Sequence, residues 1–289
     1  MIIKPFLENH KKPLYRLCEL LNKKYRYDNQ IPPRVLSSDN FEGFIATSED
    51  GALIGFVGVV FTPAYAFPFG LRAHPDQKGA GLVLSKYINK YALSKSPMIR
   101  SAFLSDNKAM QKIISADGWK SIGNYFTLIR ESPFDDFKMH NKISLATNRE
   151  LNEIINFAVL TKIGQKEYDQ MFPRDLIWYP TVSSKEVFEE LTISKRLLVE
   201  KIKGNINAVC ALNKKDDSSG MLEILRLWGE PESLLNFIAE NYRPKKIKIC
   251  VGEIEKEKWQ KLGFSTSLVF YDDELFESQY TLIEKKHSI

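Results

Sequence analysis

Residues 73 to 83 read Ala-His-Pro-Asp-Gln-Lys-Gly-Ala-Gly-Leu-Val, and the rest of the chain is best interpreted outward from this segment. An apolar run, Tyr65 to Ala73, predicts a strand before it, and Leu82 to Leu93 has helical periodicity after it. A helix start leaves backbone N–H groups unpaired and carries a partial positive charge. Gly79 and Gly81 remove side chains where a ligand would approach those groups. The segment therefore predicts a loop that binds an anion such as a phosphate, with a simple turn as the alternative.

Two well-known phosphate loops do not fit these residues. A P-loop requires Gly-Lys followed by Ser or Thr, whereas Leu82 and Val83 follow the glycines here. A dinucleotide fingerprint requires Gly or Ala at position 84, which is Leu84, and follows the first strand of a βαβ unit. Hydrolysis of a nucleoside triphosphate and Rossmann-type dinucleotide binding are therefore not supported.

The elements around the loop form a recognisable order. Ser48-Glu49-Asp50-Gly51 separates two apolar runs and predicts a hairpin, because Asp-Gly is a strong hairpin turn signal. Leu14 to Tyr25 carries apolar residues on one helix face. After the loop, the pattern predicts a strand, a helix and further strand structure at 98–104, 107–116 and 119–130.

The second half repeats this plan. Glu131-Ser132-Pro133 and Asp135-Asp136 are polar and break the periodicity, which indicates a domain boundary. Beyond it the pattern predicts strands or helices at 196–202, 206–212, 221–228, 233–242, 246–251 and 254–262, in the same order as before. The predicted fold class is α/β, a mixed sheet flanked by helices, in two tandem domains at 1–133 and 142–289.

Length and composition agree with two globular domains. The chain has 289 residues, of which 44% are apolar and 27% charged, values typical of soluble proteins. No run approaches the ~18 apolar residues that a membrane span needs. The opening ten residues reach charged side chains too early for a signal peptide, so we expect a cytoplasmic protein.

Cysteines, histidines and net charge narrow the function classes. Three separated cysteines and four histidines show no metal-ligand or disulfide spacing, so no metal site is expected and the thiols are predicted to be buried. The net charge of +5 suits an anionic ligand but is too diffuse to indicate nucleic acid, and no membrane partner is expected. The sequence does not predict an oligomeric state.

The loop segment resembles the signature of the Gcn5-related N-acetyltransferase (GNAT) family, Val-x-Pro-x-x-Arg/Gln-x-x-Gly-x-Gly/Ala. A second family signature, Asn followed after ten residues by Gly-Phe, is similar to Asn107 with Gly118-Trp119. The element order of the first half is also the family order. The resemblance implies two tandem acetyltransferase-like domains and acetyl-coenzyme A as co-substrate.

Carried over position by position, the resemblance implies a cofactor site. The pyrophosphate would bind at Lys78, Gly79, Ala80, Gly81, Leu82 and Val83. The pantetheine arm would pair with backbone at Leu71 and Ala73 and contact Asn107. Two positions depart from the pattern, because Lys78 replaces Arg or Gln and Val83 replaces a small residue.

The usual catalytic groups of the family are missing. Phe69 stands near the position of a Glu that serves as general base, and Ile114 at the position of a Tyr that protonates the thiolate. Tyr65 and Tyr125 are the substitute candidates near the expected cleft, although buried tyrosines more often only hydrogen-bond in a core.

The second half carries the resemblance more faintly. Its counterpart of the phosphate loop, Trp228-Gly229-Glu230-Pro231-Glu232, places two carboxylates and a proline where phosphates would need N–H groups. We therefore expect a degenerate domain that completes the substrate cleft or serves a structural role. Trp178, in the aromatic run 171–180, is a candidate for the acceptor pocket, with packing as the alternative. The tail 284–287 is expected to be solvated.

The resemblance implies an acetyl-coenzyme A dependent N-acetyltransferase in which an amine attacks the thioester directly in a ternary complex. Gly70-Leu71-Arg72 is similar to tandem members that acetylate free amino acids or other small amines, so a small-molecule amine is the expected acceptor. The alternative, motivated by Phe69 and Ile114, is a non-catalytic acyl-coenzyme A sensor or interaction module.

Overall fold

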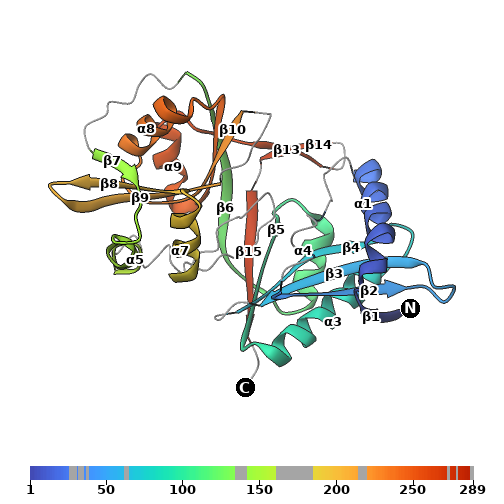
Figure 1. The fold of residues 1–289 in the computed structure, drawn as a ribbon. Coiled ribbons are helices and arrows are strands. Elements are labelled where there is room, and N and C mark those ends of the chain that lie inside the picture. The colour runs from blue at the N-terminus through green and yellow to red at the C-terminus, as the bar shows by residue number, and fades with distance from the viewer. Residues whose placement is uncertain are drawn as a thin grey trace. The chain divides into compact units, whose positions relative to one another are not determined.

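The chain folds into two compact units. The computed structural model describes residues 1–25, 31, 36, 39–61, 65–133, 142–160, 185–213, 220–271, 274–277 and 279–286. Unit 1 contains Met1–Tyr125 and Leu268–Ile289, and unit 2 contains Phe126–Ser267. The C-terminal residues therefore return to the unit that the N-terminal residues form (Figure 1).

Unit 1 contains the elements on both sides of the glycine loop. In chain order they are β1 (Ile2–Pro5), a 3-10 turn (Glu8–His10), α1 (Lys11–Tyr25), β2 (Phe41–Thr47), β3 (Leu53–Phe61), β4 (Ala66–Ala73), α3 (Ala80–Lys95), β5 (Met98–Leu104), α4 (Lys108–Ala116), the first part of β6 (Lys120–Glu131), the hairpin of β13 (Leu268–Tyr271) and β14 (Glu274–Glu277), and β15 (Gln279–Lys286). The strand order is β1-β2-β3-β4-β5-β15-β6, with β4 and β5 parallel and β15 antiparallel to β5.

Helices cover both faces of the unit 1 sheet. Side chains at alternate strand positions, among them Val57, Val59, Ala66 and Ile99, form one core with Leu84, Ile88 and Ala92 of α3. Alternation along a strand places the intervening side chains on the other face. There α1 packs against β3 and β4 with its buried residues Leu14, Leu17, Cys18 and Leu21.

Unit 2 repeats this architecture. Its elements are β7 (Lys142–Leu145), α5 (Leu151–Leu160), α7 (Lys185–Ile193), β8 (Leu197–Ile202), β9 (Asn205–Asn213), β10 (Met221–Gly229), α8 (Glu232–Tyr242), β11 (Lys246–Gly252), α9 (Glu253–Lys261) and β12 (Ser265–Thr266). The order is β7-β8-β9-β10-β11, followed by the second part of β6, to which β12 pairs. In the sheet order of each unit, the neighbour beyond the fifth strand is thus a strand that is distant in sequence. This neighbour is β15 in unit 1 and β6 in unit 2.

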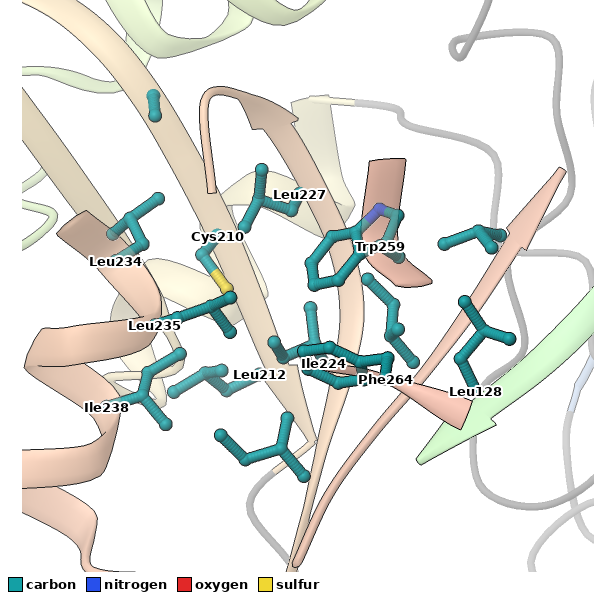
Figure 2. Close-up of a cluster of buried hydrophobic side chains, with 14 of the residues drawn as sticks. Leu128, Cys210, Leu212, Ile224, Leu227, Leu234, Leu235, Ile238, Trp259 and Phe264 are labelled. Carbon is teal, nitrogen blue, oxygen red and sulfur yellow. The ribbon is translucent and has the colours of Figure 1, made fainter. Parts of the chain in front are cut away.

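A large apolar core lies under α8 and α9. Figure 2 shows Leu235 and Ile238 of α8 directed at Leu212 and Ile224 of the strands. On the same face Trp259 meets Phe264 edge to face, with ring centroids 5.0 Å apart. All of these side chains are buried, so unit 2 is a well-packed scaffold in its own right.

The structure confirms the predicted fold class and changes the division of the chain. The sequence divided it in order, at 1–133 and 142–289, whereas the compact units divide within β6 and again after Ser267. The tail is not simply solvated, because Glu284 and Lys285 lie in β15 with side chains 15% and 25% exposed and both are ion-paired. Among the described helices, none combines the length and apolar character that crossing a bilayer requires.

Candidate functional site: the opening between β4 and β5

The parallel strands β4 and β5 separate almost as soon as they meet. Both strands are fully described, and their register holds a single residue pair, Ala66 with Ile99. A side-chain contact follows, in which Ser101 Oγ donates a hydrogen bond of 2.8 Å to the carbonyl oxygen of Pro68. Beyond this point the backbone edge of β4 has no strand partner on the β5 side, so a ligand with amide groups could pair with it.

Burial follows the separation of the strands. The first four residues of β4 are buried and the last four, Gly70 to Ala73, are partly exposed. In β5 only Ile99 is buried, although the strand lies between β4 and β15 in the sheet. Partial exposure in the middle of a sheet is unusual for packed strands and marks an opening in the sheet of unit 1.

A bulge lies in β4 just beyond the point where β4 and β5 separate. The register with β3 pairs Phe69 with Gly58 and Arg72 with Phe56, so two residues of β4 oppose one of β3. One of the two is Gly70, whose φ of +65° is readily adopted only by glycine.

The predicted anion loop stands at the end of β4. Its turn is closed by two hydrogen bonds, Gln77 N–H to His74 O at 3.0 Å and Ala80 N–H to Gln77 O at 3.2 Å. The helix α3 begins after Gly79, which has φ +85°. Within the described part of the chain the N–H groups of Lys78, Gly79, Gly81 and Leu82 find no acceptor. Four neighbouring donors without an acceptor at a helix start are a geometry that favours an anion.

Gly81 leaves space beside this helix start. A Cβ atom there would lie 3.6 Å from Ala73 Cβ and 3.9 Å from Ile113 Cδ1 of α4, which are ordinary contacts. Protein packing therefore does not require the glycine. Val83 replaces the small residue of the family signature. Because Val83 is 43% exposed, it does not fill the space beside the loop.

Three other predicted cofactor positions already have local partners. Asn107 is the N-cap of α4, and its side-chain oxygen accepts from Met110 N–H at 3.0 Å. The carbonyl oxygen of Leu71 accepts from the Arg72 side chain at 3.1 Å. Ala73 pairs with Gly55 of β3. At Asn107 the amide nitrogen, as a donor, and the second lone pair of the oxygen could still serve a ligand.

The two predicted catalytic tyrosines are not brought together. Tyr65 directly precedes β4, is 4% exposed, and lies under the Arg100 guanidinium, 5.1 Å from ring centroid to Cζ. Tyr125 is buried in β6, which is separated from β5 by β15. Phe69, near the position of the missing Glu, is buried with its ring 5.8 Å from that of Phe41. Trp178 lies outside the described residues.

Sequence reasoning missed the groups that β15 contributes. Glu284 accepts a hydrogen bond of 3.0 Å from Arg100 Nε, and Lys285 Nζ donates to the carbonyl oxygen of Asp117 at 2.6 Å. Only a strand assignment for residues 279–286, paired to β5, could have revealed them. The tail has only a short apolar stretch around Leu282-Ile283, which is too weak to specify such a partner.

The corresponding strands of unit 2 pair over a longer stretch and are more deeply buried. Here β10 and β11 keep a parallel register of four pairs, from Met221 with Lys246 to Ile224 with Ile249. Six of the nine residues of β10 are buried. A Cβ on Gly229 would lie 2.3 Å from the Asn207 carbonyl oxygen.

The unit 2 loop between β10 and α8 contains a residue that forms an ion pair. Glu230 pairs with Lys258 of α9 at 2.6 Å, and α8 starts with Pro231 as its N-cap and Glu232 in its first turn. Proline offers no N–H, and two carboxylates at a helix start repel a phosphate. Unit 2 therefore offers no counterpart of the unit 1 anion loop.

The fold is that of the GNAT acetyltransferases, a mixed sheet with a bulged fourth strand, an opening beside the fifth, and a glycine loop at a helix start. A GCN5-related N-acetyltransferase from Sphaerobacter thermophilus superposes with a TM-score of 0.67 at 12% identity, covering 99% of this chain and 95% of that one. A tandem GNAT protein from the clavulanic acid biosynthesis pathway gives 0.60 at 10% identity, covering 99% and 98%.

A GNAT-family acetyltransferase from Colwellia psychrerythraea gives 0.55 at 10% identity, with 99% and 100% covered. At these identities the likeness shows the fold, here over the whole chain. No protein-family model and no curated protein sequence matches the chain. The described residues contain no cluster of three or more His, Cys, Asp or Glu side chains that could hold a metal ion.

Proposed function

We propose that the chain is an acetyl-coenzyme A dependent N-acetyltransferase whose single cofactor site is in unit 1. The observation that carries the proposal is the opening between β4 and β5, which leads from the bulge at Gly70 toward the unpaired N–H groups at Lys78 to Leu82. A pyrophosphate suits the loop, and a pantetheine amide suits the unpaired edge of β4. Unit 2, with its more deeply buried β10 and its Glu230–Lys258 pair, serves as a non-binding domain.

Acetyl-coenzyme A supplies an activated acyl group, and the residues of unit 1 hold it. The acceptor ammonium first loses one proton to solvent or to a base. The amine nitrogen then forms a bond to the thioester carbonyl carbon as the carbon–sulfur bond breaks, and the second nitrogen proton neutralises the thiolate. The unpaired backbone of β4 can orient the thioester, which is the positioning that such a direct transfer needs. The acceptor we propose is a small-molecule amine.

Calorimetric titration of acetyl-coenzyme A tests the site. The intact chain should bind one molecule per chain, and Gly81→Glu should lose binding because it places a carboxylate at the anion loop. Gly81→Ala is the matched control, since its methyl meets neighbours at ordinary distances. Unchanged binding in Gly81→Glu, or two molecules per chain, would contradict the assignment. Binding without turnover on any amine would instead favour the acyl-coenzyme A sensor, which Phe69 and Ile114 keep as the second candidate.

A further inference from the structure

The two helices beside the glycine loop of unit 1 carry lysine as their only charged residue type. Neither α3 nor α4 contains an arginine or an acidic residue. Lys95, at the end of α3, pairs with Glu42. The other lysines here are exposed and make no ion pair or hydrogen bond with any described residue. Together with the loop lysine they form a surface that we call the basic face, which consists of Lys78, Lys86, Lys90, Lys108 and Lys112.

The basic face lies on one side of the unit 1 sheet. The helix α3 packs on the sheet through Leu84 and Ile88, and α1 packs on the opposite side. The helix α4 lies beside α3, because Asn89 Nδ2 of α3 donates to the Asp117 carboxylate at the end of α4 at 2.5 Å. From its first residue to Lys90, α3 extends about 15 Å. The basic face therefore continues well beyond the loop that a pyrophosphate would occupy.

Unit 2 shows that the fold does not require these lysines. Its corresponding helix α8 carries Glu232 and Glu240 and no lysine. Its helix α9 mixes three glutamates with three lysines, of which Lys258 and Lys261 are ion-paired. Unpaired charges of one sign repel each other, so a cluster of them does not stabilise the fold. The difference between the repeats thus points to an anionic partner of unit 1.

The composition of the basic face favours a protein as that partner. Val83 and Tyr87 are 43% and 36% exposed and lie within one turn of Lys86 and Lys90 on α3. Apolar side chains among lysines suit an acidic protein surface that also has apolar residues. Arginine, which makes the commonest specific contacts to nucleic acids, is missing from both helices.

The place of the basic face indicates which substrate the partner brings. The loop at Lys78 to Leu82 suits a phosphate, and the edge of β4 suits the amides of a pantetheine arm. Whatever is attached to the far side of that phosphate extends over α3 and α4. We propose that the basic face binds an acidic carrier protein that holds an acyl group as a thioester on a phosphopantetheine arm.

The carrier is then a second acyl donor beside acetyl-coenzyme A. The amine nitrogen forms a bond to the thioester carbonyl carbon, the carbon–sulfur bond breaks, and the thiol of the arm keeps the proton that the amine releases. This inference rests on the proposed function of unit 1 and adds a partner to the same site.

The test measures binding of a fluorescent acidic acyl carrier protein, loaded with acetyl on its arm, by anisotropy. The wild-type chain should bind it, and the double variant Lys86→Glu/Lys90→Glu should bind at least about tenfold more weakly. Acetyl-coenzyme A binding should stay unchanged in this variant, because both lysines lie more than one turn beyond the loop. The matched control is Lys12→Glu/Lys23→Glu, which reverses two exposed charges on α1 and should bind the carrier normally.

The other outcomes are distinguishable. Absence of carrier binding in the wild-type chain that still binds acetyl-coenzyme A overturns the inference, as does equal binding in Lys86→Glu/Lys90→Glu. A parallel loss of acetyl-coenzyme A binding would assign the lysines to the nucleotide of the cofactor and also overturn it. So would binding of an RNA oligonucleotide in place of the carrier. A wild-type chain that binds neither thioester overturns the proposed function of unit 1 itself.

Discussion

The Ser101 hydroxyl of β5 donates to the carbonyl oxygen of Pro68 in β4, 2.8 Å away, and this bond marks the point where the two strands cease to be neighbours. Before it the strands form one backbone pair, and beyond it the residues of β4 from Gly70 to Ala73 are partly exposed. One side chain thus bridges the packed part of the sheet to the part that we assign to ligand binding.

Ser101→Ala should weaken unit 1 modestly. The bond is between a hydroxyl and a backbone carbonyl, and such bonds contribute about 1 kcal/mol net. We expect a loss of that size in the free energy of unfolding, measured in urea, together with weaker acetyl-coenzyme A binding. Ser101→Thr keeps the hydroxyl and is the control. A fully stable Ser101→Ala protein with normal binding would show that the bridge is not needed.

Substitution of glycine by alanine in the corresponding loops should lower the stability of unit 2 but not that of unit 1. Gly229→Ala forces a methyl to within 2.3 Å of the Asn207 carbonyl at φ +93°, whereas Gly81→Ala meets only ordinary contacts. We expect Gly229→Ala to destabilise unit 2 by roughly 2 kcal/mol or more and Gly81→Ala to leave the unfolding temperature nearly unchanged. Thermal unfolding followed by circular dichroism measures both. Equal shifts would contradict the difference in backbone packing.

Asp117 should matter for the stability of unit 1. Its carboxylate accepts from Asn89 Nδ2 of α3 at 2.5 Å and pairs with Lys285 of β15 at 3.2 Å. Asn89 is buried, so Asp117→Ala leaves a buried amide without this acceptor, at a cost of about 1–3 kcal/mol. Glu257→Ala removes an exposed pair with Lys261 and should cost much less. Denaturant unfolding of the two variants gives the comparison.

Ionisation of the Glu42 carboxylate should make the free energy of unfolding depend on pH. Burial would raise the pKa of Glu42, but hydrogen bonds from Lys95 and Tyr91 outweigh it and hold that pKa below its usual value. A lowered folded-state pKa gives stabilisation that is present above about pH 4.3 and lost as the pH falls through the folded value. The stability difference between wild type and Glu42→Gln should therefore shrink below about pH 4. A constant difference across that range would argue against the shift.

The cysteines should be inert in the native protein. All three are buried, and burial raises the pKa of the Cys210 and Cys250 thiols. Because the thiolate is the reactive form, a colorimetric thiol reagent at pH 8 should label none of them before unfolding and three in guanidinium chloride. Rapid labelling of the native chain would show that one of these sites opens.

The local elements were predictable because each depends on nearby residues. The Asp50-Gly51 turn and the strands beside it follow from short-range patterns, and in the structure Gly51 has φ +85°. The strand 98–104 and the helix after Asn107 have the bounds that their periodicity predicts, within one residue. The loop between β4 and α3 could be predicted for the same reason, since strand, glycines and helix are contiguous in the chain.

What the sequence alone determined was therefore the fold class, its repetition and the loop at Lys78 to Val83. Only the tertiary structure decided that β15 returns to β5, because strand pairing across the whole chain depends on long-range contacts that no local pattern encodes. That pairing sets Glu284 opposite Arg100. The tertiary structure also decided that β4 and β5 share one residue pair in unit 1 whereas β10 and β11 share four in unit 2, a difference between the repeats that their similar local patterns do not encode.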